Sequence, residues 1–119
     1  RQKRVNYKYF SLDEFACSET GDNLMDTGFV AQLDALRERC GFPFTVTSGY
    51  RAPTHSVEAV KEKPGMHSTG LAVDIAVANG VQRRKIVEEA FRGGFTGIGV
   101  AKTFVHVDMR VTTPVMWTY

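Results

Sequence analysis

The chain lacks the features that mark several large classes of protein. No apolar run in its 119 residues approaches the roughly 20 residues that a membrane-spanning helix needs. We find no internal repeat and no low-complexity tract. A formal net charge of +2 is too small to predict binding to nucleic acid. What is left is the composition of one ordinary globular domain, with 43% hydrophobic and 24% charged residues.

Cysteine is also scarce, since the chain has only Cys17 and Cys40. Neither belongs to a Cys-x-x-Cys pair, so the sequence does not predict a cysteine-based zinc site. Both lie within the first 40 residues. A disulfide bond between them and two buried free thiols are equally compatible with this placement.

Capping signals and helical periodicity predict three helices. The first is short: the capping box Ser11–Glu14 opens it, and it runs through Phe15 and Ala16. The second begins at Asp26 or Thr27 and ends near Cys40, where a glycine supplies a stop signal. The third covers Val81–Arg92, whose apolar residues recur at helical spacing and which ends at a pair of glycines.

Four segments are rich in β-forming residues and predict strands: Phe44–Ser48, Leu71–Val77, Thr96–Val100 and Phe104–Arg110. The last two are joined by a tight connection, so we expect them to be antiparallel neighbours. Residues 51–65 contain prolines and many charges and predict a loop with one short helix. The order of elements predicts an α+β domain with a small, largely antiparallel sheet and flanking helices.

Three polar residues stand out against this background. Asp74 interrupts an apolar strand, where a carboxylate is costly unless it is paired or bound to a metal. His67 precedes that strand on a glycine-bounded loop, and His106 lies in the last predicted strand. Two imidazoles and a carboxylate suit Zn²⁺, and three protein ligands leave a fourth tetrahedral position for water, as in catalytic sites. Each residue alone also has common structural uses, such as a core histidine or a capping carboxylate.

The three residues belong to ordered motifs. These read Ser48-Gly49-Tyr50-Arg51, His67-x-x-Gly70-x-Ala72-x-Asp74, Gly97-Ile98-Gly99, and Phe104-Val105-His106-Val107-Asp108-x-Arg110. In this order and spacing the chain resembles the zinc D-Ala-D-Ala carboxypeptidase family, in its short phage and bacterial form. The same superfamily includes lysostaphin-type peptidases and the hedgehog signalling domain. The resemblance runs from about Phe10 to Tyr119, so we expect residues 1–9 to be an N-terminal extension and 10–119 to be the zinc peptidase domain.

The resemblance implies that His67, Asp74 and His106 bind Zn²⁺. It implies that Arg51 holds a substrate carboxylate or carbonyl, for which the planar guanidinium is suited. The implied substrate is the stem peptide of peptidoglycan, cut at D-Ala-D-Ala or at an L-Ala-D-Glu-type bond. Zinc would polarise the scissile carbonyl and lower the pKa of water toward ~7.

The resemblance also implies where such a protein works. We see no signal-peptide-like apolar segment, which argues against independent secretion and is compatible with an endolysin-like protein. It would be part of a phage particle, or released from the host cytoplasm at lysis, and would act on the cell wall. We expect a monomer.

The sequence offers two candidates for the general base. Better-known family members carry Glu or Asp three residues before the last zinc-binding histidine, whereas this chain has Thr103, which is no base at ordinary pH. Asp108 shares a strand face with His106 and is one candidate; alternatively, it orients the zinc-bound imidazole. His55 is a second candidate base or a substrate contact, or else an exposed loop histidine.

Four further side chains are candidates for contact with substrate. Ser48 and Tyr50 lie in the first motif; Tyr50 either lines the cleft and donates to an oxyanion or packs in the core. Trp117 either forms a wall of the pocket or packs the C-terminal segment. Arg110 either contacts substrate or pairs with Asp108.

Three functions are compatible with these motifs. The first is a zinc peptidase acting on peptidoglycan. The second is a module that binds cell-wall peptide without cutting it, which Thr103 favours. The third is a structural domain of a phage tail or its assembly, in which the metal site is vestigial.

Overall fold

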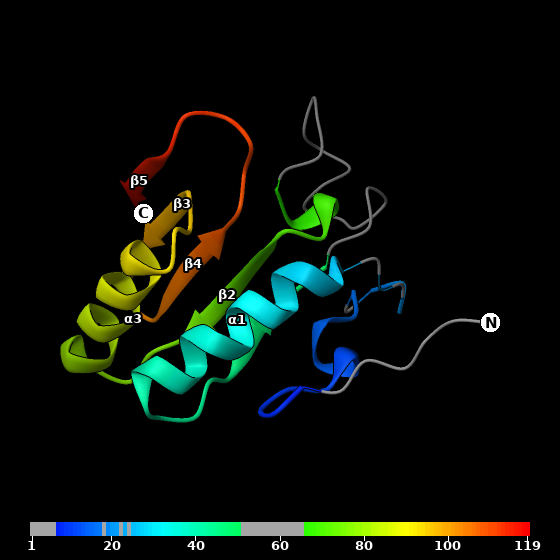
Figure 1. Ribbon diagram of the computed structural model, residues 1–119, viewed down its shortest axis with the longest axis horizontal. Coiled ribbons are helices and arrows are strands. Elements are labelled where there is room, and N and C mark those ends of the chain that lie inside the picture. The colour runs from blue at the N-terminus through cyan, green and yellow to red at the C-terminus, as the bar shows by residue number, and fades with distance from the viewer. Residues whose placement is uncertain (1–6, 18, 22, 24, 51–65) are drawn as a thin grey trace.

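The computed structural model describes residues 7–17, 19–21, 23, 25–50 and 66–119 (Figure 1). Its elements are η1 (Leu12–Phe15), α1 (Thr27–Cys40), β1 (Val46–Ser48), η2 (Met66–Thr69), β2 (Ala72–Ala76), α3 (Gly80–Arg92), β3 (Gly97–Val100), β4 (Phe104–Asp108) and β5 (Val115–Thr118). Among the described residues, five strands form one sheet in the order β1-β2-β4-β3-β5. Neighbouring strands are antiparallel except β3 and β5, which are parallel. The predicted α+β fold with a largely antiparallel sheet is confirmed.

Helix α1 begins and ends where its sequence signals predict. The carboxylate of Asp26 accepts a hydrogen bond from the backbone N–H of Phe29 at 2.9 Å, which satisfies one of the free donors at the start of the helix. Gly41 ends the helix with a φ of 77°, a left-handed conformation that favours glycine. Leu33 and Leu36 are fully buried on the inner face of the helix.

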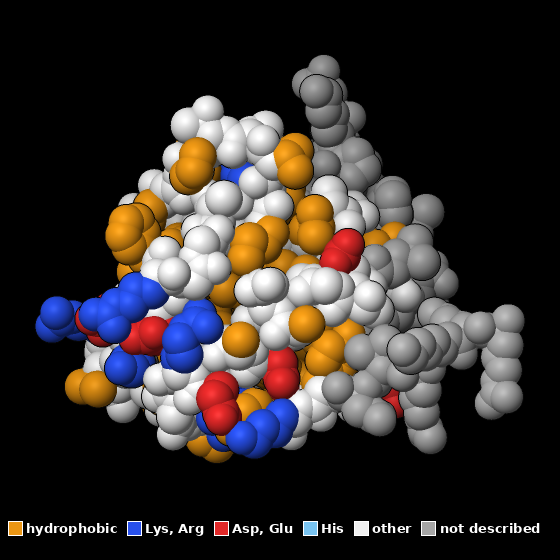
Figure 2. All heavy atoms as spheres, in the orientation of Figure 1, with side chains coloured by type: hydrophobic (Ala, Val, Ile, Leu, Met, Phe, Trp, Pro, Cys, Tyr) orange, Lys and Arg blue, Asp and Glu red, His pale blue; other side chains and the backbone are white. Residues whose placement is uncertain are grey.

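Helix α3 packs beside α1, and both cover the same face of the sheet (Figure 1). A buried carboxylate links the two helices, because Glu89 of α3 lies 3.3 Å from Arg39 of α1 and 3.6 Å from Lys85 of its own helix. Figure 2 shows this face of the molecule, where Lys, Arg, Asp and Glu side chains gather over the outer sides of the helices. In the part of the chain that the structure describes, no helix has the length and apolar composition needed to cross a membrane.

The two faces of the sheet carry different chemistry, because successive side chains of a strand point to opposite sides. The side chains directed at the helices are Val73, Ile75, Ile98, Val105 and Val107, all of which belong to the hydrophobic core. The alternating positions of β2 and β4 place Asp74, His106 and Asp108 on the other side. The sheet therefore separates an apolar core from a polar face.

Strand β5 is the one element of the sheet that its sequence does not predict. It pairs with β3 in parallel register, with Trp117 opposite Gly99, and the N–H of Val115 donates to the carbonyl of Thr96 at 2.9 Å. Because β5 is an edge strand whose residues are mostly exposed, it has no clear alternation of apolar and polar residues. Its pairing with β3 brings Trp117 onto the polar face.

The segment before η1 lies against α1. The backbone N–H groups of Lys8 and Tyr9 both donate to the carboxylate of Asp34, at 3.2 and 2.8 Å. The hydroxyl of Tyr7 donates to the carbonyl of Thr27 at 3.0 Å. These contacts hold residues 7–9 on the surface of the first long helix.

Cys17 and Cys40 are both buried, and no disulfide bond joins them. Burial raises the pKa of the Cys40 thiol to about 11. A thiol with this pKa is protonated at neutral pH and is a poor nucleophile.

Candidate metal centre

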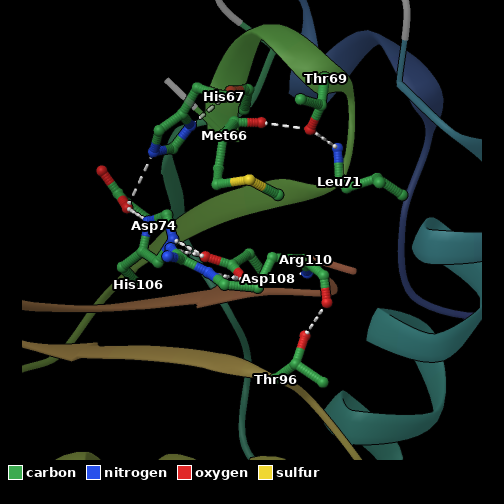
Figure 3. Close-up of polar contacts among 10 residues, drawn as sticks. Met66, His67, Thr69, Leu71, Asp74, Thr96, His106, Asp108 and Arg110 are labelled. Carbon is green, nitrogen blue, oxygen red and sulfur yellow. Dashed lines mark hydrogen bonds and ion pairs between the residues drawn. The ribbon is translucent and has the colours of Figure 1, made fainter. Parts of the chain in front are cut away.

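His67, Asp74 and His106 come together on the polar face of the sheet. One ligand atom from each of them lies within 4.8 Å of the other two, and all three residues are buried. Helix η2 supplies His67, while Asp74 and His106 are directly opposite each other in the pairing of β2 with β4. Figure 3 shows the His67 ring directed toward Asp74 from above the strands. The three residues singled out in the sequence therefore converge on one point.

The backbone of the first motif orients His67. Nδ1 of His67 lies 2.8 Å from the carbonyl oxygen of Gly49, and a carbonyl only accepts, so Nδ1 carries the proton. Nε2 is left facing Asp74, with its nitrogen 3.3 Å from the carboxylate oxygen. A Cβ at position 49 would lie 2.7 Å from the backbone of Phe15, so only glycine brings this carbonyl so close. Sequence reasoning missed this acceptor because it belongs to the backbone.

Asp74 is ionised at neutral pH even though it is buried. Burial by itself would raise the pKa of this carboxyl, but its hydrogen-bonding and electrostatic interactions with the imidazoles of His106 and His67 outweigh burial and lower the pKa to about 2. The side chain therefore offers a negative charge between two imidazoles.

The geometry of this donor set fits zinc. Nitrogen and oxygen ligands of a tetrahedral zinc ion, at their usual bond lengths, lie about 3.4 Å from one another. The corresponding separations are 3.3 Å between His67 and Asp74 and 3.0 Å between His106 and Asp74. Small movements would accommodate an ion, and the two nitrogens and one oxygen are the ligand types that zinc takes in proteins.

Behind His106 lies a second carboxylate, that of Asp108. Nε2 of His106 lies 2.7 Å from Oδ2 of Asp108, and the Asp108 side chain is fully buried. Arg110 donates to the same carboxylate from its backbone N–H at 3.1 Å, from Nε at 3.0 Å and from Nη2 at 2.7 Å. Each carboxylate oxygen thus accepts two hydrogen bonds from described residues.

These contacts shift both pKa values. Burial would raise the pKa of Asp108, but the donors on His106 and Arg110 hold it well below its usual range. Burial would likewise lower the pKa of His106, but hydrogen bonds to Asp108 and Asp74 raise it. The imidazole and its two carboxylates stabilise one another's charged forms.

Trp117 covers the side of His106. The indole and imidazole centroids are 5.1 Å apart, with the rings inclined at 50°. The guanidinium carbon of Arg110 lies 4.9 Å from the centre of the indole, within the range of a cation–π interaction. The aromatic residue from the unpredicted strand is therefore part of the surroundings of the metal-ligand cluster.

The motif Gly97-Ile98-Gly99 makes room for these side chains. A Cβ at Gly97 would lie 2.1 Å from the Asp108 carboxylate, and a Cβ at Gly99 would lie 2.7 Å from the Trp117 indole. Strand β3 thus contributes no side chain at these two positions. Its glycines leave the space that Asp108 and Trp117 fill.

Of the other residues that the sequence suggested, Ser48 lies near the cluster and Tyr50 lies in the core. Ser48 pairs with Asp74 in the sheet and lies beside the cluster. Tyr50 is buried in the hydrophobic core, and its N–H donates to the carbonyl of Phe15 at 2.7 Å, so the packing alternative fits its position. Arg51 and His55 lie outside the described residues.

A comparison with known protein families gives one match. The family model described as Peptidase M15 matches residues 8–108, which include His67, Asp74 and His106. A comparison with curated proteins finds no match.

Proposed function

This chain belongs to the Peptidase M15 family, and we propose that it is a zinc-dependent hydrolase of peptide bonds in peptidoglycan stem peptides. The observation that carries the proposal is the buried cluster of His67, Asp74 and His106, whose ligand atoms lie within 4.8 Å of one another. The bond cut is of the D-Ala-D-Ala or the L-Ala-D-Glu type. Because this substrate lies in the cell wall, the proposal includes delivery by a phage particle or release at host lysis.

In this proposal the chain's own residues prepare the site. His67 presents Nε2, because the Gly49 carbonyl holds the proton on Nδ1. Asp74 supplies an anionic oxygen that offsets part of the charge of the ion. A bound zinc ion would supply Lewis acidity, polarising the scissile carbonyl and lowering the pKa of water toward about 7.

Residues on both sides of the cluster are proposed to hold the peptide. Ser48 of β1 lies on the side of Asp74, and Trp117 of β5 lies on the side of His106. The half-buried indole offers an apolar wall for a small side chain such as that of D-Ala. Arg51 is proposed to bind the substrate carboxylate in bidentate fashion.

The proposal assigns the general base to His55. Thr103 occupies the position where relatives carry a carboxylate, and its side chain is neutral. Both oxygens of Asp108 already accept two hydrogen bonds each. A histidine titrates near neutral pH, as a base in such a reaction requires.

Two measurements test the peptidase. Protein purified without chelator should contain about one zinc per chain, as expected of a site with three protein ligands. Digestion of muropeptides followed by mass spectrometry should give new termini with wild type and none with His106→Ala. Substrates that end in D-Ala-D-Ala, and substrates that retain only the L-Ala-D-Glu bond, distinguish the two cleavage sites. Equal product from wild type and His106→Ala would contradict the proposal.

The absence of a carboxylate at Thr103 favours one alternative, a module that binds cell-wall peptide without cutting it. This alternative predicts that zinc-loaded protein sediments with purified cell walls and leaves no new termini after long incubation. It also predicts that His55→Ala binds as wild type does. Under the peptidase proposal, His55→Ala should keep its zinc and lower kcat by about 100-fold or more.

A further inference from the structure

We propose that Asp108 and Arg110 are a positioning pair, which holds the proton of His106 on Nε2 and presents Nδ1 to the metal. The inference rests on the zinc site of the proposed function but not on peptidase activity. It gives a role to a buried ion pair that the hydrolysis itself does not use. In this role Asp108 touches neither metal nor substrate.

The hydrogen bond between His106 and Asp108 has a fixed direction. Nε2 of His106 lies 2.7 Å from Oδ2 of Asp108, and an ionised carboxylate accepts but does not donate. Nε2 therefore carries a proton. Nδ1 is the nitrogen that points at Asp74, 3.0 Å away, where the ligand atoms converge. Nδ1 also faces a carboxylate, but the contact of Nε2 with Asp108 is the shorter one, 2.7 Å against 3.0 Å, so the single proton of the neutral imidazole belongs on Nε2.

Arg110 holds the Asp108 carboxylate at both oxygens. Its backbone N–H and Nε bind Oδ1, while Nη2 binds Oδ2, so both oxygens are held in one plane. A planar guanidinium provides such two-point geometry, which a lysine ammonium does not. The guanidinium also neutralises a charge that is fully buried. Asp108 is therefore prevented from rotating away from His106.

Trp117 links Arg110 back to His106. Arg110 stacks on Trp117, with its guanidinium carbon 4.9 Å from the ring centre, and Trp117 in turn lies against His106 at 5.1 Å. The four side chains of His106, Asp108, Arg110 and Trp117 form a closed cycle. Gly97 leaves space for the carboxylate in this cycle, because a Cβ there would lie 2.1 Å from it.

This cycle extends past the part of the chain that the family model matches. The match ends at residue 108, so Arg110 and Trp117 lie beyond it. Arg110 directly follows β4 and reaches Asp108 two residues away, whereas Trp117 reaches the cluster because β5 pairs with β3. The C-terminal segment is thereby coupled to the orientation of a metal ligand.

The test reads protons and metal affinity, independently of activity. Long-range ¹H–¹⁵N spectra should show His106 protonated on Nε2 in zinc-loaded protein and, at alkaline pH, in metal-free protein. Asp108→Asn should weaken zinc binding by about 10–100-fold, measured by competition with a chelator, because an amide has no charge and only one accepting oxygen, so its NH₂ group would face a donor of Arg110 or His106. Gly97→Ala should weaken it in the same direction, because it displaces the carboxylate without removing it.

Glu89→Gln is the matched control, because it neutralises another buried carboxylate, one that links the two helices. It should lower stability and leave the zinc affinity within about twofold. A proton on Nδ1 of His106 in metal-free protein at alkaline pH would overturn the inference, as would wild-type zinc affinity in Asp108→Asn. Wild-type zinc binding without peptide cleavage would refute the proposed peptidase and leave the positioning pair intact.

Discussion

On the helix side of the sheet, Val105 and Val107 of β4 pack into the hydrophobic core and are 0% exposed. On the other side, the alternating residues His106 and Asp108 are 4% and 0% exposed. One short strand thus buries both of its faces, but by different means. The valines are covered by helices, whereas the polar residues are enclosed by their own partners.

The two faces of β4 therefore tolerate substitution differently. Apolar burial is not directional, so the core side depends mainly on volume. A buried polar group is costly without a hydrogen bond, and among the described residues every buried side-chain nitrogen and oxygen has a partner. Substitutions on the helix side should therefore change stability, and those on the polar side should change metal binding.

The largest expected effect comes from separate substitutions of two adjacent residues of β4, one on each face of the sheet. His106→Gln should weaken zinc binding by more than about 100-fold, since removing even a group that orients a ligand costs 10–100-fold. Val107→Ala should instead lower the free energy of unfolding by about 2 kcal/mol, through lost burial and a cavity. Chelator competition and urea unfolding measure the two quantities. A zinc affinity of folded Val107→Ala that differs more than about twofold from wild type would break the division between the faces.

Acid should remove the stability that the ionised carboxylate of Asp74 contributes on the polar face. The pKa of Asp74 falls from 3.8 to about 2 on folding, so its ionised form stabilises the protein above pH 3.8. That contribution is lost as the pH falls toward 2, and it is on the order of 2 kcal/mol. In metal-free protein, the stability advantage of wild type over Asp74→Asn should shrink by this amount between pH 5 and pH 2. Urea unfolding at each pH measures it, and a constant difference would contradict the assignment.

The smallest expected effect concerns the glycines of β3. Gly99→Ala should push the Trp117 ring aside and cost about 1 kcal/mol, because the new Cβ would lie 2.7 Å from the indole. Trp117 is the only tryptophan of the chain, so its fluorescence reports the change directly. Gly80→Ala is the matched control, since a Cβ there lies 3.5 Å from its nearest neighbour, an arginine side chain. An unchanged emission spectrum in Gly99→Ala would remove Trp117 from the surroundings of the site.

Much of the fold follows from local signals in the sequence. Helix α1 begins after Asp26 and ends at Gly41, as the capping rules predict, and the pairing of β3 with β4 is confirmed. The sequence did not predict β5, because an exposed edge strand has little apolar alternation. The parallel pairing of β5 with β3 is seen only in the folded chain.

The sequence likewise predicted part of the candidate site and left the roles of other residues open. The motifs singled out His67, Asp74 and His106, and these three do converge. For Asp108 the sequence left two roles open, and the hydrogen bonds from His106 and Arg110 favour the orienting one. The roles of Arg51 and His55 stay predictions.

The sequence alone is enough to predict the alternation of β4 and the set of residue types that suit zinc. Alternation follows from the two-residue period of a strand, and donor chemistry follows from the side chains, so neither needs long-range contacts. Which nitrogen of each imidazole faces the cluster depends on the tertiary structure. That choice depends on the Gly49 carbonyl and the Asp108 carboxylate, and on the space left at Gly97 and Gly99. Backbone acceptors and empty space have no side-chain signature, so they exist only once the chain has folded.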